Sequence, residues 1–104
     1  MTIYQGNRGR YGDIVVKVIS DDRTSLLNTC YNLIQHSPDG FEWGYDGSGP
    51  AQLAFALLYN ATDKTFIAQR LHQRFKHRYI ATIKESHWEI GKDFILKWVA
   101  ECQK

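Results

Sequence analysis

Alternating apolar and polar positions predict strands in the first part of the chain. β-branched residues alternate between two faces over residues 14–19, which is typical of a half-buried strand. A shorter apolar pair, Ile3-Tyr4, precedes it, and glycines and charged residues separate the two. The pattern therefore predicts an antiparallel hairpin with its tip at residues 7–12. Residues 24–34 fit either a strand or a short helical turn, and we expect a strand.

A continuous apolar run at residues 51–58 predicts a buried central helix, because such a helix has no polar face to turn toward solvent. Ser48-Gly49-Pro50 is a typical helix start, since proline suits the first helical position. We expect this helix to end near Asn60. The turn chemistry before it, together with four glycines in residues 40–49, predicts a long loop leading into the helix.

Apolar residues at three- and four-residue steps predict a second helix, capped by Thr62 or Asp63. Its expected buried stripe is Phe66, Ile67, Leu71, Phe75, Tyr79, Ile80 and Ile83. A short strand at residues 88–90 and a last helix that begins at Gly91 or Lys92 complete the pattern. The fold class predicted is α+β, with a small antiparallel sheet from the N-terminal half covered by two or three helices.

The composition is that of one globular domain spanning residues 1–104. Of the 104 residues, 43% are hydrophobic and 23% are charged, which argues against disorder. No apolar run is long enough for a membrane span, and no signal-peptide pattern is present at the start. Cys30 and Cys102 match no metal or redox spacing, so we expect two reduced thiols and a cytoplasmic protein.

The charge is distributed unevenly along the chain. Although the net charge is +2, residues 62–104 hold nine basic and five acidic side chains, a balance of +4. Residues 64–84 hold six basic side chains, two histidines and no acid. Such a block creates a local positive field, although a solvated helix face is the plainer interpretation of any charge run.

The segment HSPDGFEWGYDGSGPAQLAFALL at residues 36–58 combines glycines and aromatic rings directly before a helix. A glycine-rich turn that leads into a helix N-terminus exposes backbone N–H groups, and the helix dipole favours an anion there. The loop is neither a Walker A loop nor a GxGxxG fingerprint. The alternative is a tight loop whose glycines let the backbone pass close to a packed helix.

Phe41, Trp43 and Tyr45 alternate along an extended segment, and alternation allows them to share a face. With three rings so close together, we expect one or two in the core and one exposed. If exposed, they would form a stacking platform for a nucleobase or another flat ring, and if buried, they belong to the core. Beyond the loop, arginines and a histidine recur on one face of the second predicted helix. Arginine binds phosphate or carboxylate bidentately, which makes that face a candidate anion contact.

These features together predict a site for an anionic ligand. Its expected members are Trp43, Tyr45, Gly47, Ser48, Gly49, Gln52, Arg70, Arg74, His77, Arg8 and Arg10. The histidines show no zinc spacing, and the serines lack a nucleophile elbow. We therefore expect no catalytic residue, no metal and no cofactor.

The block at residues 36–54 matches the pattern H-S-P-x-G-F-E-W-G-Y-x-G-S-G-P-A-Q-L-A. It resembles the signature of an uncharacterised family of small proteins from phages and bacteria, a domain of unknown function. Phe75-Lys76 and Trp88-Glu89-Ile90 extend the resemblance over most of the chain, whereas Asp46 and Phe55 replace residues that are smaller in the family. The resemblance implies that this block is the shared working part, and it implies no activity.

Two functions from different classes follow from the sequence. The first is a small non-enzymatic protein that captures an anionic, nucleotide-like ligand such as a cyclic-nucleotide signal. By analogy with small phage proteins, it would act as a phage-encoded sponge that antagonises host defence. The alternative is a protein-interaction module that inhibits a host protein through the aromatic loop. We expect neither a membrane nor a nucleic acid as partner, and the sequence leaves a homo-oligomer open.

Overall fold

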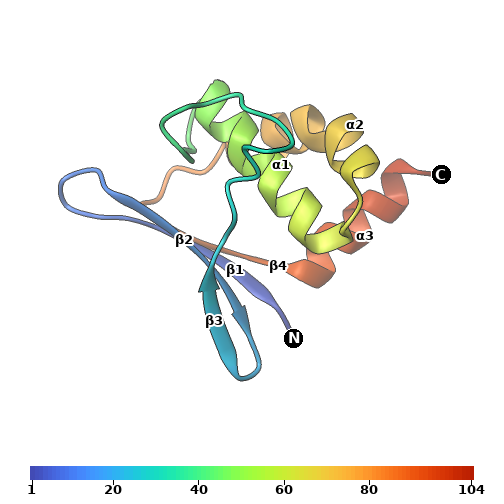
Figure 1. Ribbon diagram of the computed structural model, residues 1–104, viewed down its shortest axis with the longest axis horizontal. Helices are drawn as coiled ribbons and strands as arrows, with labels where there is room; N and C mark the ends of the chain where they lie inside the picture. The colour runs from blue at the N-terminus through green and yellow to red at the C-terminus, as the bar shows by residue number, and fades with distance from the viewer. The chain divides into compact units, whose positions relative to one another are not determined.

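The computed structural model describes residues 1–104, which form two compact units. The first unit contains residues 1–27 and 86–104, and the second contains residues 28–85. The first unit holds an antiparallel sheet and the C-terminal helix, and the second holds two packed helices (Figure 1). The predicted α+β class is therefore confirmed. None of the helices is long and apolar enough to cross a membrane.

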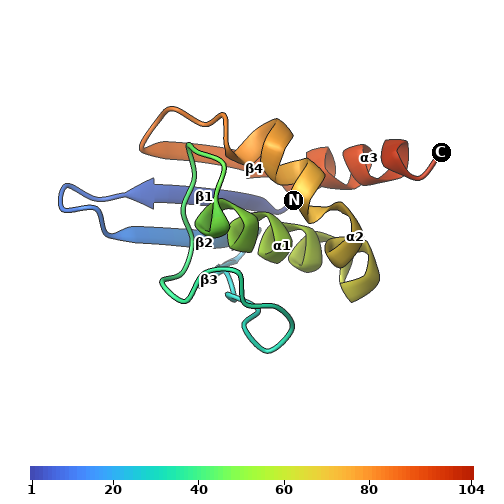
Figure 2. The same cartoon turned by 90° about the horizontal axis from the view of Figure 1, so that it is seen from above.

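The sheet consists of four antiparallel strands in the order β3-β2-β1-β4 (Figure 2). Strands β1 (Ile3–Arg8) and β2 (Ile14–Ser20) form the expected hairpin, with Ile3 opposite Ile19. Strand β3 (Arg23–Leu26) pairs with β2, and β4 (His87–Gly91) pairs with β1 from the C-terminal part of the chain.

The two faces of the sheet differ in polarity, as strand alternation requires. Tyr4, Val16 and Trp88 are buried on one face, where the Trp88 ring lies directly against Gly6. On the other face, Gln5 Nε2 donates a hydrogen bond of 3.0 Å to Glu89 Oε2. Helix α3 (Lys92–Cys102) follows β4 at the expected residue, Gly91.

The second unit is built on helices α1 (Ser48–Thr62) and α2 (Thr65–Phe75), which pack side by side (Figure 2). Helix α1 begins slightly earlier than predicted, because Gly47 rather than Ser48 or Gly49 is its N-cap and Pro50 is its third residue, and residues 49–58 are all buried. Helix α2 continues into a π-helical turn, η1 (Lys76–Ile80), in which the Ala81 N–H donates to Lys76 O. A π-helical turn is rare and often marks a functional position.

Three details of the predicted second helix were wrong. Asp63 does not cap α2; it ends α1 with a left-handed φ of 56° and donates its N–H to Tyr59 O. The N-cap of α2 is Lys64, which makes no side-chain capping bond. Phe66 is 69% exposed rather than buried, because it lies on the outer side of the first turn of α2. The regular helical repeat also stops at η1, before Ile83.

The strand expected over residues 24–34 ends at Leu26, and no strand or helix lies between residues 27 and 47. This long connection runs around the N-terminal end of α1 (Figure 1). Its backbone groups bind a side chain of α1 instead of a neighbouring strand, as described below. That exchange of hydrogen-bond partners explains why the β-like sequence does not extend the sheet.

Candidate functional site

The glycine-rich loop before α1 is fixed to η1 and to the segment that follows η1. The Gly44 N–H donates a 3.1 Å hydrogen bond to Ile80 O, and Trp43 Nε1 donates a 2.9 Å bond to Glu85 O. Gly44 has a φ of +89°, and a Cβ there would lie 2.9 Å from Ile83 O. Only glycine fits this position without strain. The loop therefore passes η1 at very close range.

Asp46 of the loop forms an ion pair with Lys76 of η1 and also lies close to His77. Asp46 Oδ1 lies 2.7 Å from Lys76 Nζ, and Asp46 Oδ2 lies 3.4 Å from His77 Nδ1. The Lys76 side chain is only 9% exposed, whereas the Asp46 side chain is 58% exposed. The hydrogen bond from Lys76 lowers the pKa of the Asp46 carboxyl below its usual value. A carboxylate is thus already bound to a largely buried ammonium group at this place.

The rings of Trp43 and Tyr45 do not share a face, and Phe41 is partly buried. Trp43 is 2% exposed, whereas Tyr45 is 50% exposed. The left-handed backbone at Gly44, between the two, interrupts the strand-like alternation on which the prediction depended. Trp43 cannot stack on a ligand from its buried position, so of the two rings expected to stack, Tyr45 alone is accessible.

The N-terminus of α1 lies directly after Asp46 in the chain. Gly47 is the N-cap and forms no side-chain capping bond, so the first-turn N–H groups of Ser48 and Gly49 have no partner within the helix. Ser48 is exposed, whereas Gly49 is buried. A Cβ on Gly49 would lie 2.6 Å from Glu42 Cβ, and a Cβ on Gly47 would collide with the Tyr45 ring. These two glycines therefore serve close packing, as the alternative interpretation held.

Gln52, expected to contact a ligand, is instead a buried structural residue. It is 0% exposed, and its amide binds the backbone of the long connection. Gln52 Nε2 donates to Thr29 O at 2.6 Å and to Ile34 O at 3.0 Å, while Oε1 accepts from His36 N at 2.7 Å. A weaker bond of 3.4 Å comes from Ser37 N. The side chain has no atom left for a ligand.

A pair of histidines forms a second attachment of the same connection. His36 Nε2 lies 2.8 Å from Nε2 of the buried His72, and their ring centroids are 5.0 Å apart. His72 Nδ1 donates to Ala68 O at 2.9 Å, so in neutral His72 the Nε2 atom is the acceptor and His36 is the donor. Burial lowers the pKa of His72 below its usual value.

The cationic face predicted on the second helix is exposed. Arg70 and Arg74 lie one turn apart on α2, and His77 follows one turn later with a side chain that is 58% exposed. His77 is also the residue that approaches Asp46. The cationic face of α2 therefore ends at His77, next to the Asp46 carboxylate of the loop. Arg8 and Arg10 belong to the sheet unit, at and beyond the end of β1.

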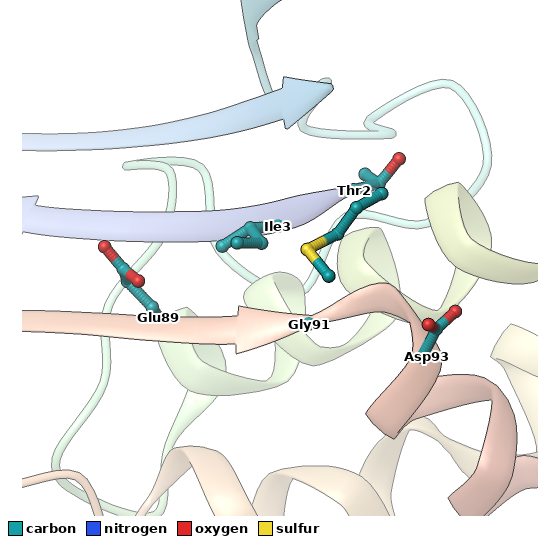
Figure 3. A pocket seen from close by; sticks show the side chains of 6 residues that line it. Thr2, Ile3, Glu89, Gly91 and Asp93 are labelled. Carbon is teal, nitrogen blue, oxygen red and sulfur yellow. The ribbon is translucent and has the colours of Figure 1, made fainter. Parts of the chain in front are cut away.

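A separate hollow of about 300 Å³ lies in the sheet unit, where β1 begins and β4 passes into α3 (Figure 3). Glu89 and Asp93 line it together with Met1, Thr2, Ile3 and Gly91. Two carboxylates would repel an anion. This hollow is therefore a poor candidate for the ligand class that the sequence predicts.

Sequence reasoning missed Lys76, Asp46 and the histidine pair as interacting groups. One signal was present: Ala68, His72 and Lys76 follow one another at four-residue steps beside the buried stripe. Two ionisable residues on the buried side of a helix require partners, because burial of an unpaired polar group is costly. The partners lie about thirty residues away in the chain, and spacing alone could not identify them.

The sequence resembles an uncharacterised family over most of its length, and a comparison with family models gives a match of similar extent. A model of a family of unknown function, DUF6166, matches residues 4–101. The chain belongs to this family. No curated protein and no solved structure matches the chain. The expected membership of an uncharacterised family is thereby confirmed.

In this DUF6166 protein, replacing Gln52 with leucine should destabilise the fold. Gln52→Leu removes the partner of two backbone carbonyls and two N–H groups, and each buried group left unpaired costs about 1–3 kcal/mol. Chemical denaturation should show a loss of about 3 kcal/mol or more. Gln73→Leu, at an exposed position of α2, is the matched control and should change stability little. Equal effects of the two substitutions would contradict the structural role of Gln52.

The histidine pair predicts a loss of stability at mildly acidic pH. The unfolded chain binds a proton at His72 near pH 6.5, whereas the folded chain binds it only at a lower pH. The free energy of unfolding should therefore fall as pH decreases from about 6.5 toward the lowered pKa, by up to about 1.4 kcal/mol per pH unit. Denaturation at pH 7.5, 6.5 and 5.5 measures this slope. A His72→Gln variant with an unchanged slope would refute the assignment.

Proposed function

We propose that the protein is a non-enzymatic binding protein for an anionic, nucleotide-like ligand. The ligand's anionic group would bind where the loop before α1 meets η1. The single observation that supports this most is the Lys76 ammonium group, which is largely buried yet holds an exposed carboxylate, that of Asp46. The Lys76 ammonium group binds the Asp46 carboxylate of its own chain. The same positive charge and N–H donors are what a ligand's anionic group requires.

The surroundings of Lys76 add donors and positive charge. The exposed Ser48 hydroxyl and the N–H groups of the first turn of α1 lie within three residues of Asp46. Helix N-termini favour anions by roughly 0.3–1 kcal/mol at exposed sites. On the other side, His77 leads to Arg74 and Arg70 in a stretch without any acid from residue 64 to residue 84. The side of the site formed by α2 and η1 therefore carries an excess of positive charge.

Tyr45 supports a ligand that also carries a flat ring. Its ring lies against Gly47, where there is no room for a Cβ, and half of the side chain is exposed. A base stacked on an aromatic side chain gains about 1–3 kcal/mol. An aromatic platform next to an anion-binding position is the combination that a nucleotide would use.

The biological setting is a separate part of the proposal. We infer that the captured ligand is a nucleotide signal, and that a phage-encoded copy of this protein would remove such a signal from host defence. This setting rests on the resemblance of residues 36–54 to proteins of phages and bacteria. Capture of this kind needs affinity and no catalytic group, which agrees with the expectation that the protein is not an enzyme.

The alternative is a protein-interaction module that uses the aromatic loop as its contact. Tyrosine and tryptophan dominate binding hot spots. Trp43, the largest expected contact, is buried, which leaves Tyr45 as the main exposed ring of the loop. The burial of Trp43 removes a ring from both functions, so the Lys76 ammonium group is the observation that favours an anionic ligand.

Thermal shift and calorimetry with adenosine monophosphate, inorganic phosphate and adenosine test the proposal. The two phosphate compounds should stabilise the protein, and adenosine, which lacks the charge, should not. Arg74→Ala should weaken nucleotide binding about tenfold, because a hydrogen bond to a charged group contributes about 1.5–3 kcal/mol. Arg23→Ala, an exposed arginine of β3, removes the same charge and should leave affinity unchanged.

The outcome that contradicts the proposal is equally specific. If no phosphate-bearing compound stabilises the protein, the anion site does not function as described. The alternative function is correct if two results occur together. No small molecule binds, and a pull-down with the wild type captures a protein partner that Tyr45→Ala does not capture. If Arg74→Ala and Arg23→Ala behave alike, the site does not include α2.

A further inference from the structure

The Asp46–Lys76 pair is asymmetric in a way that bears on ligand selection. The Lys76 side chain is 9% exposed and belongs to η1, so the cation is held inside the unit. The Asp46 side chain is 58% exposed, so the anion is the partner that solvent can reach. Of the two groups, the carboxylate is the one that can be exchanged for another.

The loop also permits that exchange without unfolding. Its backbone is fixed before Asp46 by the hydrogen bond from Gly44 N–H to Ile80 O, and after Asp46 by the start of α1 at Ser48. Rotation about the side-chain bonds of Asp46 is therefore enough to move the carboxylate away from Lys76. The cation then remains in place for an incoming group.

We propose that Asp46 is a built-in competitor that makes the site selective for doubly charged phosphate groups over monocarboxylates. This inference rests on the proposed function and specifies the ligand class of the same site. A carboxylate ligand would replace one carboxylate with another of equal charge. Because Asp46 is attached to the loop, it binds Lys76 intramolecularly, and a free monocarboxylate must displace it without any gain in charge.

A phosphate monoester differs from Asp46 in both charge and number of acceptors. At pH 7 it carries about −1.5 to −2 charges and three strongly accepting oxygens. Lys76 has three N–H donors, and Asp46 is bound to Nζ through one oxygen, so a phosphate can use donors that the carboxylate leaves unused. His77, whose Nδ1 lies 3.4 Å from Asp46 Oδ2, offers a further donor, and the exposed Ser48 lies two residues after Asp46 in the chain. The exchange is therefore favourable for phosphate and unfavourable for a monocarboxylate.

Asp46→Asn tests the inference, with Asp39→Asn as the control. Both substitutions remove one negative charge from an exposed position of the same unit, but only Asp46 binds Lys76. Calorimetry with inorganic phosphate and with acetate, at one ionic strength and pH 7.5, measures selectivity. The wild type and Asp39→Asn should bind phosphate and not acetate. Asp46→Asn should bind phosphate about fivefold tighter and should gain measurable acetate binding. Asp46→Ser, which shortens the side chain as well, should behave like Asp46→Asn.

Three results would overturn the inference, and they differ from the failure of the proposed function. Unchanged phosphate affinity and selectivity in Asp46→Asn would show that Asp46 does not compete. Weaker phosphate binding in Asp46→Asn would show that Asp46 supports the ligand instead of excluding it. Equal gains in Asp46→Asn and Asp39→Asn would assign the effect to net charge. If no variant binds phosphate, the proposed function itself is wrong, and the inference falls with it.

Discussion

A largely buried lysine must have an opposite charge within reach, because an unpaired ammonium group inside a protein is strongly disfavoured. Lys76 meets this requirement with Asp46, a residue of a loop thirty positions earlier in the chain. That pairing acts together with the hydrogen bond from the Gly44 N–H to Ile80 O, and the two contacts hold the loop against η1. The exposed Tyr45 precedes Asp46 in the loop, α1 begins two residues after it, and the cationic face of α2 ends at His77 beside the Asp46 carboxylate.

The remainder of the long connection is held by neutral groups. Gln52 satisfies backbone donors and acceptors from Thr29 to Ser37, and the pair of His36 and His72 adds one hydrogen bond that requires a neutral imidazole as acceptor. A segment without regular structure stays ordered only when its backbone groups find such partners. Gln52 and Trp43, both within residues 36–54, therefore serve packing. The exposed functional groups next to the start of α1 belong to Tyr45, Asp46 and Ser48.

The sequence predicted the regular elements well and the accessibility of the site poorly. Strand alternation identified β1, β2 and β4, and Ser48-Gly49-Pro50 marked the start of α1, because these signals are local. The sequence predicted one or two buried rings in the loop, but which ring is buried was not predictable, because the left-handed Gly44 between Trp43 and Tyr45 ends the alternation. The role of Gln52 depends on backbone groups fifteen to twenty-three residues away, and spacing within the chain gives no sign of them.

The most direct test of the central claim is a titration of the ¹⁵N-labelled protein with adenosine monophosphate, followed by amide chemical shifts. Binding at Lys76 predicts saturable shifts concentrated at residues 45–49 and 74–78, where the loop, the start of α1 and η1 meet. Shifts that are absent, or that are confined to the sheet unit, would contradict the claim that the buried Lys76 charge forms the anion site.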